Sequence, residues 1–318
     1  LRVSQTSISK FNLRKRTSSE KLIDIGFKYI VIAMASLVAI VLFSIFTVVY
    51  YESTESIGRY GLSFLFTSSW NPVTDEYGAF TAIYGTLFTS VASLIIAIPL
   101  GVGTAIFITE DIIPIFFKNL IGIMVELLAA IPSVVLGLWA VFIMEPFIRP
   151  ALNKIYIFFS WIPFFSTEPL GAGMMPAILI LVVMILPIIT SISKDSLIQV
   201  PSKLRQASYG IGASRWTTIF KVLLPAAISG ITGGILLALG RAMGETMAVT
   251  MIIGNSNNFS WSIFAPSYTI SSMLANQFGE ADGNQVSSLM FAALILISLT
   301  LVINILAQIL VKRLSLKY

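Results

Sequence analysis

Long, uninterrupted runs of apolar residues limit what this chain can fold into more than any other feature. Because a helix rises about 1.5 Å per residue, about 20 apolar residues cross the roughly 30 Å hydrocarbon core of a bilayer. Six runs reach or approach that length, and they cover residues 29–50, 81–109, 117–144, 174–193, 226–253 and 287–311. The sequence therefore predicts an all-α integral membrane protein with six transmembrane helices.

The composition agrees with a membrane protein and excludes several kinds of site. Hydrophobic residues make up 56% of the 318 residues and charged residues 11%, which no ordinary soluble domain shows. The sequence contains no cysteine and no histidine, so we expect no disulfide, no thiolate or imidazole metal site and no histidine proton relay. A net charge of +5 would suggest a nucleic-acid partner for a soluble chain. In a membrane protein the distribution of that charge is more informative, and we expect no nucleic acid.

Lysine and arginine are distributed unequally between the two sides that six spans define. An even number of spans places both termini on the same side. Of the 20 lysines and arginines, only Arg59, Arg149 and Lys154 fall on the opposite side, and Arg241 falls inside a span. By the positive-inside rule, both termini are predicted to be cytoplasmic.

The spans divide the chain into a short N-terminal part and a larger core. We expect a basic cytoplasmic tail at 1–28, a first transmembrane helix at 29–50, an extracytoplasmic loop at 51–80 and a core of five helices at 81–313, with a cytoplasmic loop at 195–225. A cleaved signal peptide is the alternative for the first helix. Its apolar core would be only about 7 to 15 residues long, so we favour a retained helix.

Several residues interrupt the apolar character of the core. Pro99, Pro132 and Pro187 each bend a predicted helix or leave a carbonyl for another group to satisfy. Glu126 is a carboxylate inside the third span, and the sequence does not assign it a role. The aromatic stretch at 155–165 is too short to span a bilayer, so we expect an interfacial or re-entrant segment.

The fifth span contains two opposite charges, Arg241 and Glu245, in the sequence RAMGETMAV. A lone arginine at the bilayer centre costs at least about 2.5 to 3.5 kcal/mol, so it requires compensation. On a continuous helix, residues four apart share a face and can pair. Two interpretations stay open: an ion pair that only stabilises the bundle, or a functional site, which is the usual role of intramembrane charges.

Small residues crowd the same span. Gly230 and Gly234, followed by Gly240 and Gly244, have the four-residue spacing that lets helices approach closely. We therefore expect this helix to be central in the bundle rather than to face lipid.

The loop before that span predicts two short helices that meet at a glycine turn. Ser202 can cap the first helix, Gly210 and Gly212 can end it, and Ser214 can cap a second helix that runs to Pro225. The apolar side chains among its charges are Leu204, Ile211, Trp216, Ile219 and Phe220. Such a loop could lie on anionic lipid or dock in the groove of a cytoplasmic partner.

The residues of this loop resemble those of bacterial ABC importer permeases, whose pattern is Glu-Ala-Ala, three residues, Gly, nine residues, Ile, one residue, Leu-Pro. The matching positions are Gln206, Ala207, Ser208, Gly212, Val222, Leu224 and Pro225, with Gln, Ser and Val in place of Glu, Ala and Ile. In that family the loop is the coupling helix, which seats in a cleft of the ATP-binding subunit. The resemblance implies that the matching residues contact an ATPase, with Trp216 as an apolar anchor.

The segment 241–255, RAMGETMAVTMIIGN, narrows the resemblance to the PstC family of phosphate permeases. The segments 85–110, 126–140 and 184–197 also resemble that family, and the similarity covers roughly residues 60–313. It implies a MetI-like ABC importer fold in a bacterial plasma (inner) membrane. It also implies a channel-forming subunit that moves inorganic phosphate into the cell and is not itself an enzyme.

The resemblance further implies a set of partners. These are a second permease resembling PstA, two ATPase subunits resembling PstB, an external phosphate-binding protein resembling PstS, and membrane lipid. No GxxxxGK[ST] phosphate loop occurs in these residues, so we expect no cofactor in this chain and ATP with Mg on the ATPase.

Arg241 and Glu245 match the family's arginine and its companion carboxylate. A guanidinium grips two phosphate oxygens with parallel hydrogen bonds, which an ammonium cannot do. We expect Glu245 to neutralise Arg241 until phosphate displaces it, and Thr246 and Thr250 to offer further donors. Sulfate is the alternative substrate. A secondary transporter, typically built from repeats and broken helices, and a noncatalytic scaffold are the alternatives of other classes.

The last extracytoplasmic segment, 254–286, contains no lysine or arginine. Residues 266–278 predict a short amphipathic helix. Tyr268, Met273, Leu274 and Phe278 either contact the external binding protein or pack onto their own bundle.

Overall fold

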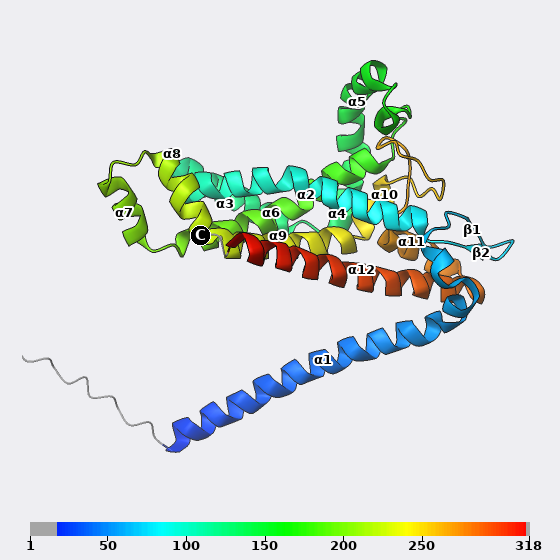
Figure 1. Ribbon diagram of the computed structural model, residues 1–318, viewed down its shortest axis with the longest axis horizontal. Helices are drawn as coiled ribbons and strands as arrows, with labels where there is room; N and C mark the ends of the chain where they lie inside the picture. The colour runs from blue at the N-terminus through cyan, green and yellow to red at the C-terminus, as the bar shows by residue number, and fades with distance from the viewer. Residues whose placement is uncertain (1–17, 316–318) are drawn as a thin grey trace, which may run out of the picture. The chain divides into compact units, whose positions relative to one another are not determined.

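The computed structural model describes residues 18–315, and almost all of its regular structure is helical (Figure 1). Within this range six helical segments are long and apolar enough to cross a membrane. They are Leu22–Leu65, Phe80–Thr109, Ser133–Phe159, Met174–Ile198, Arg215–Gly244 and Asn284–Ile309. The prediction of an all-α, multi-pass membrane protein with six spans is confirmed, although the limits of several spans differ.

The chain divides into two compact units between Val48 and Val49. The described part of the first unit is the beginning of α1 (Ser18–Tyr60). The second unit continues with η1 (Gly61–Leu65), β1 (Trp70–Asn71), β2 (Glu76–Tyr77), α2 (Phe80–Thr109), α3 (Ile115–Ala130), α4 (Ser133–Trp139), η2 (Ala140–Met144), α5 (Glu145–Phe159) and η3 (Pro163–Phe165). It ends with α6 (Met174–Ile198), α7 (Ser202–Gly210), α8 (Arg215–Thr218), η4 (Ile219–Leu223), α9 (Leu224–Gly244), α10 (Met247–Ile252), α11 (Ile270–Gln277), η5 (Phe278–Glu280) and α12 (Asn284–Ser315).

The first helix is longer than the predicted span at 29–50. It begins at Ser18 and continues to Tyr60, because no proline interrupts it and the first of the described residues with positive φ is Gly61. Of the predicted tail at 1–28, residues 1–17 lie outside the described residues and the rest are helical. The predicted loop at 51–80 is partly helical, and it also holds the antiparallel hairpin of β1 and β2.

The third predicted span, 117–144, is wrong because the helix breaks at Pro132. A residue before proline is pushed toward extended backbone, and Ile131 has ψ 128°. A new helix begins at Ser133 and runs through a π-helical turn, η2, to Phe159. Of the segment predicted at 155–165 to be interfacial or re-entrant, residues 155–159 belong to α5 and Pro163–Phe165 forms a 3₁₀ turn. Its location at the membrane interface stays a prediction.

The core of the second unit surrounds α6, which packs against α2 and α9. The apolar stretch of α6 is 61% buried, compared with 33% for that of the helix from Arg215 to Gly244. Helix α6 is thus the more buried of the two. The expectation that the fifth span is central rather than lipid-facing stays a prediction: it packs against α6, α2 and α12, and one face of α9 stays open. Its glycines divide accordingly. Any side chain at Gly230 or Gly234 would overlap α6, whereas Gly240 and Gly244 have no neighbour within 4 Å of such a Cβ.

The second unit carries different elements at its two ends (Figure 1). We call the end with α7 and α8 the α7 end, and the end with α5, α10 and α11 the α11 end. Helix α11 begins with a capping box between Thr269 and Ser272. Tyr268 and Met273 are buried in the core, so this segment packs onto its own bundle, and of its predicted contact residues Phe278 is the most exposed.

Candidate functional site

The RAMGET sequence forms a break between two helices, so the continuous span predicted at 226–253 is wrong. Helix α9 ends at Gly244, Glu245 takes extended backbone with ψ 124°, and α10 begins at Met247. Glycine weakens a helix. The groups freed by the break find partners: the buried Glu245 carboxylate accepts from the Ala248 N–H at 3.5 Å, and Ser271 Oγ donates to the Met243 carbonyl at 3.1 Å. Specific hydrogen bonds therefore stabilise the break.

Arg241 lies in the last turn of α9 on the exposed face of the chain. Among the described residues it has no ion pair and no hydrogen bond. The predicted pair with Glu245 is not formed, because the extended backbone at Glu245 removes the four-residue helical register. The negative end of the helix dipole favours the charge, and all five guanidinium N–H donors stay free for a ligand.

Arg241 lines a cavity of about 80 Å³ together with apolar residues of α3, α4 and α6. Leu128 of α3 and Pro187 of α6 are among these residues. Thr246 and Thr250, which were expected to add donors, use their hydroxyls on backbone carbonyls: Thr246 Oγ1 donates to Gly244 at 3.1 Å and Thr250 Oγ1 to Thr246 at 2.7 Å. Arg241 is thus a lone cation against an apolar wall.

The α7 end contains the two short helices that the sequence predicts. Gly212 joins them with φ +83°, as expected for a glycine turn. Ser214 caps α8, since its Oγ accepts from the Thr217 N–H at 3.2 Å. The cap predicted at Ser202 is wrong, because Pro201 occupies the N-cap position and its side chain makes no capping bond.

The seven residues matched to the coupling loop differ in exposure. Gln206, Ala207 and Gly212 are exposed, whereas Ser208 is buried and bonds to Thr218 Oγ1 at 2.9 Å. Pro225 lies half-buried at the start of α9.

Most of the expected apolar anchors also face outward. The ring of Trp216 stacks on that of Phe220 with 6.0 Å between centroids, and both side chains are more than half exposed. Leu204 and Ile211 are exposed as well. Ile219 was expected to be a further anchor, but it is fully buried in the core.

Ion pairs and a hydrogen bond that the sequence did not indicate lie where the α7 end meets the rest of the bundle. Arg205 Nη2 donates to Glu110 Oε1 at 2.7 Å, and the Glu110 side chain is only 5% exposed. Arg215 Nη1 donates to the Asp111 carbonyl at 2.7 Å. Lys118 Nζ bonds to the Asp111 carboxylate at 2.8 Å, and this hydrogen bond together with the lysine charge lowers the pKa of Asp111. These contacts join α7 and α8 to the segment between α2 and α3.

A further ion pair that the sequence did not indicate compensates a buried carboxylate of α5. Arg149 Nε and Nη2 donate to the two oxygens of Glu145 at 2.7 and 2.6 Å. The residues are four apart on one helix, and the Glu145 side chain is 7% exposed. The four-residue rule that fails at Arg241 therefore holds here, where no break intervenes.

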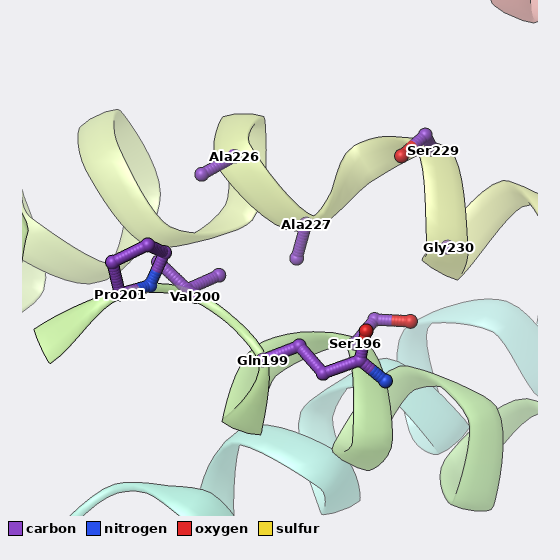
Figure 2. A pocket seen from close by; sticks show the side chains of 8 residues that line it. All are labelled: Ser196, Gln199, Val200, Pro201, Ala226, Ala227, Ser229 and Gly230. Atoms are coloured by element: carbon purple, nitrogen blue, oxygen red, sulfur yellow. The ribbon is translucent and has the colours of Figure 1, made fainter. Parts of the chain in front are cut away.

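Helices α6 and α9 separate beyond their close contact at Gly230 and leave a cavity of about 260 Å³ (Figure 2). Ser196, Gln199 and Ser229 provide its polar groups, and Ser196 Oγ donates to the Ile192 carbonyl at 2.7 Å. No charged side chain lines it. The cavity therefore does not fit an anion.

Comparison with known proteins agrees with this architecture. Residues 97–316 match the family described as binding-protein-dependent transport system inner membrane component. A chain of the bacterial alginate ABC transporter, solved with its alginate-bound periplasmic protein, superimposes with a TM-score of 0.62 at 16% identity, over 92% of this chain and 97% of that chain. The expected ABC importer permease fold is confirmed.

Two curated relatives are more similar in sequence. The phosphate transport system permease protein PstC of Mesorhizobium japonicum is 44% identical over 289 residues, which cover 89% of this chain and 88% of the relative. The protein of the same name from Pasteurella multocida is 39% identical over 96% of this chain and 98% of its own length. The chain therefore belongs to the binding-protein-dependent transport system inner membrane components, and within them to the PstC family of permeases.

Proposed function

We propose that this chain is the transmembrane permease subunit of an ATP-driven importer that moves inorganic phosphate into the cell. The observation that carries the proposal is the unpaired Arg241 at the break between α9 and α10. A discontinuous membrane helix presents polar groups to a substrate near the middle of the bilayer. The names of the relatives support phosphate as that substrate.

In the mechanism we infer, Arg241 grips two oxygens of phosphate with its planar guanidinium. Its exposed face requires a second permease subunit to close the site, and the outward glycines Gly240 and Gly244 allow that subunit to approach closely. Glu245 stabilises the break through Ala248 rather than neutralising the arginine. Rocking of the two subunits then exposes the anion to alternate sides of the membrane.

The α7 end supports an ATPase as the source of energy. Exposed apolar residues on a short helix suit docking into a groove better than lying on lipid, because an ion pair holds α7 and a hydrogen bond holds α8 to the bundle. We infer two ATPase subunits resembling PstB, which bind ATP and Mg, a second permease resembling PstA and an external binding protein resembling PstS. We infer from this arrangement that the α7 end and both termini lie in the cytoplasm and that the chain lies in the bacterial inner membrane.

An ion-driven secondary transporter is the alternative that the helix break also fits. The coupling loop and the family favour ATP instead. The test is uptake of labelled phosphate by the reconstituted importer with its binding protein. We expect uptake to require internal ATP and to be displaced by unlabelled phosphate but not by equal sulfate. Uptake that an ion gradient drives without ATP, or equal displacement by sulfate, would contradict the proposal.

A further inference from the structure

Helices α3 and α6, which line the Arg241 cavity, also line another cavity, where the cationic side chains are lysines. It has a volume of about 530 Å³ and lies between the beginning of α3 and the last turns of α6. Its polar side chains are Lys118, Asn119, Glu126 and Lys194. The cavity has no role in the transport mechanism proposed for Arg241. Glu126 is the intramembrane carboxylate to which the sequence assigns no role.

The charges in this cavity favour an anion. Lys194 is half-buried and has no ion pair or hydrogen bond among the described residues. The Lys118 side chain is 13% exposed, and its partner Asp111 is 97% exposed, so that pair is strongly screened by solvent. A half-buried ammonium without a partner is costly, and an oxyanion between the two lysines would compensate it.

The cavity also lies in series with the one that Arg241 lines. Both cavities have walls from α3 and α6: Leu128 and Ile188 contribute to the Arg241 cavity, whereas Lys118 and Lys194 contribute to the second. Lys194 lies six residues after Ile188, which corresponds to about 9 Å along α6. An anion that leaves Arg241 toward the α7 end therefore meets Lys194 next.

We propose that this cavity is a second binding site for a phosphate-type oxyanion, held by Lys118 and Lys194. In transport it is where phosphate rests before release, and in this respect the proposal rests on the proposed function. Glu126 shares the cavity and repels the anion, which keeps binding weak enough for the ion to leave. The phosphate group of an anionic lipid has the same chemistry, so the test separates the two sources.

The absence of cysteine makes a labelling test direct, because Asn119→Cys introduces a single thiol into this chain. The assembled importer is reconstituted in phosphatidylcholine vesicles, and labelling of this chain by neutral N-ethylmaleimide is timed with inorganic phosphate or with chloride of equal ionic strength. At a phosphate concentration of about twice the dissociation constant, labelling falls about threefold, because about one site in three is then empty. In Lys194→Gln this protection is lost, and in Glu126→Gln it appears at lower phosphate.

Two controls make the result specific. Ser229→Cys reports on the uncharged cavity of Figure 2 and should not be protected, and Lys154→Gln removes an exposed charge of α5 and should leave the protection of Asn119→Cys unchanged. Protection without added phosphate in vesicles that contain phosphatidylglycerol would assign the site to a lipid phosphate. Equal labelling in phosphate, chloride and phosphatidylglycerol vesicles would overturn the site while leaving the uptake test of Arg241 unaffected.

Discussion

Arg205 of α7 donates a 2.7 Å hydrogen bond to Glu110, a buried carboxylate at the end of α2 that lies 95 residues earlier in the chain. This bond connects the proposed coupling helix α7 directly to the membrane helix α2. Asp111, the next residue, holds Arg215 through its carbonyl and Lys118 through its carboxylate. A displacement of α7 and α8 by an ATPase is therefore transmitted to α2 and to α3, whose far end lines the Arg241 cavity.

Glu110→Gln should uncouple transport from ATP hydrolysis. The change leaves Arg205 without its charged partner, and since that side chain is 35% exposed we expect a loss of stability of only about 1 to 2 kcal/mol. The number of phosphate ions imported per ATP should fall clearly, while the melting temperature of the complex should change little. Asp75→Asn breaks the solvent-exposed Arg59–Asp75 pair, which lies outside this route, and is the matched control with little effect. An unchanged ratio of phosphate to ATP in Glu110→Gln would remove the bond from the coupling route.

Gly212→Val should release the ATPase from the permease. Gly212 has φ +83° but open space around its Cα, so the substitution acts on backbone conformation alone, at a cost of about 1 to 2 kcal/mol for an L residue. Co-purification of the ATPase with the permease measures the effect. Gly210→Val, which also has open space but no positive φ, should retain it. Normal co-purification and uptake in Gly212→Val would refute the docking role of the turn.

Trp216→Ala should weaken ATPase binding by about 2 kcal/mol or more, equivalent to about 30-fold, if the exposed stack with Phe220 is the apolar centre of the interface. Titration of detergent-solubilised permease with the ATPase gives the affinity. Lys221→Ala, an exposed charge close by, should change it far less. Equal affinities for Trp216→Ala and the wild type would place the interface elsewhere.

Asn257→Cys should react with a membrane-impermeant thiol reagent added from outside. The residue lies in the segment between α10 and α11, where Thr81 Oγ1 donates to its carbonyl at 3.0 Å. Lys203→Cys, on α7 at the opposite end, should react only after the membrane is opened. The reverse pattern would invert the proposed topology.

The apolar runs were sufficient to predict the membrane class and the number of spans, and the glycines and serines of the loop predicted the turn at Gly212, because each depends on local sequence. The predicted spans at 117–144 and 226–253 run across Pro132 and Gly244, where the structure has helix breaks. Hydropathy continues across a break, and only partners such as Ser271, which bonds to the Met243 carbonyl from a distant helix, decide that the backbone unwinds there. Hydropathy windows carry no information on such contacts.

The candidate site was predictable in its residues but not in its geometry. Arg241 stood out because charge is rare in a span. Its predicted pairing with Glu245 required a helix that continues through residue 245, but α9 ends at Gly244. Glu110 and Arg205 looked like ordinary loop charges, since nothing in a single sequence indicates a contact across 95 residues.

Uptake of labelled phosphate by an Arg241→Lys importer tests the central claim most directly. Lysine keeps the charge but replaces the guanidinium fork by a point charge, so we expect uptake to fall about tenfold or more, the value of one lost charge-assisted hydrogen bond, in a complex that assembles normally. Assembly is measured beside transport by co-purification of all subunits. A fully assembled Arg241→Lys complex with wild-type uptake and coupled ATP hydrolysis would contradict the account and leave Arg241 outside the phosphate path.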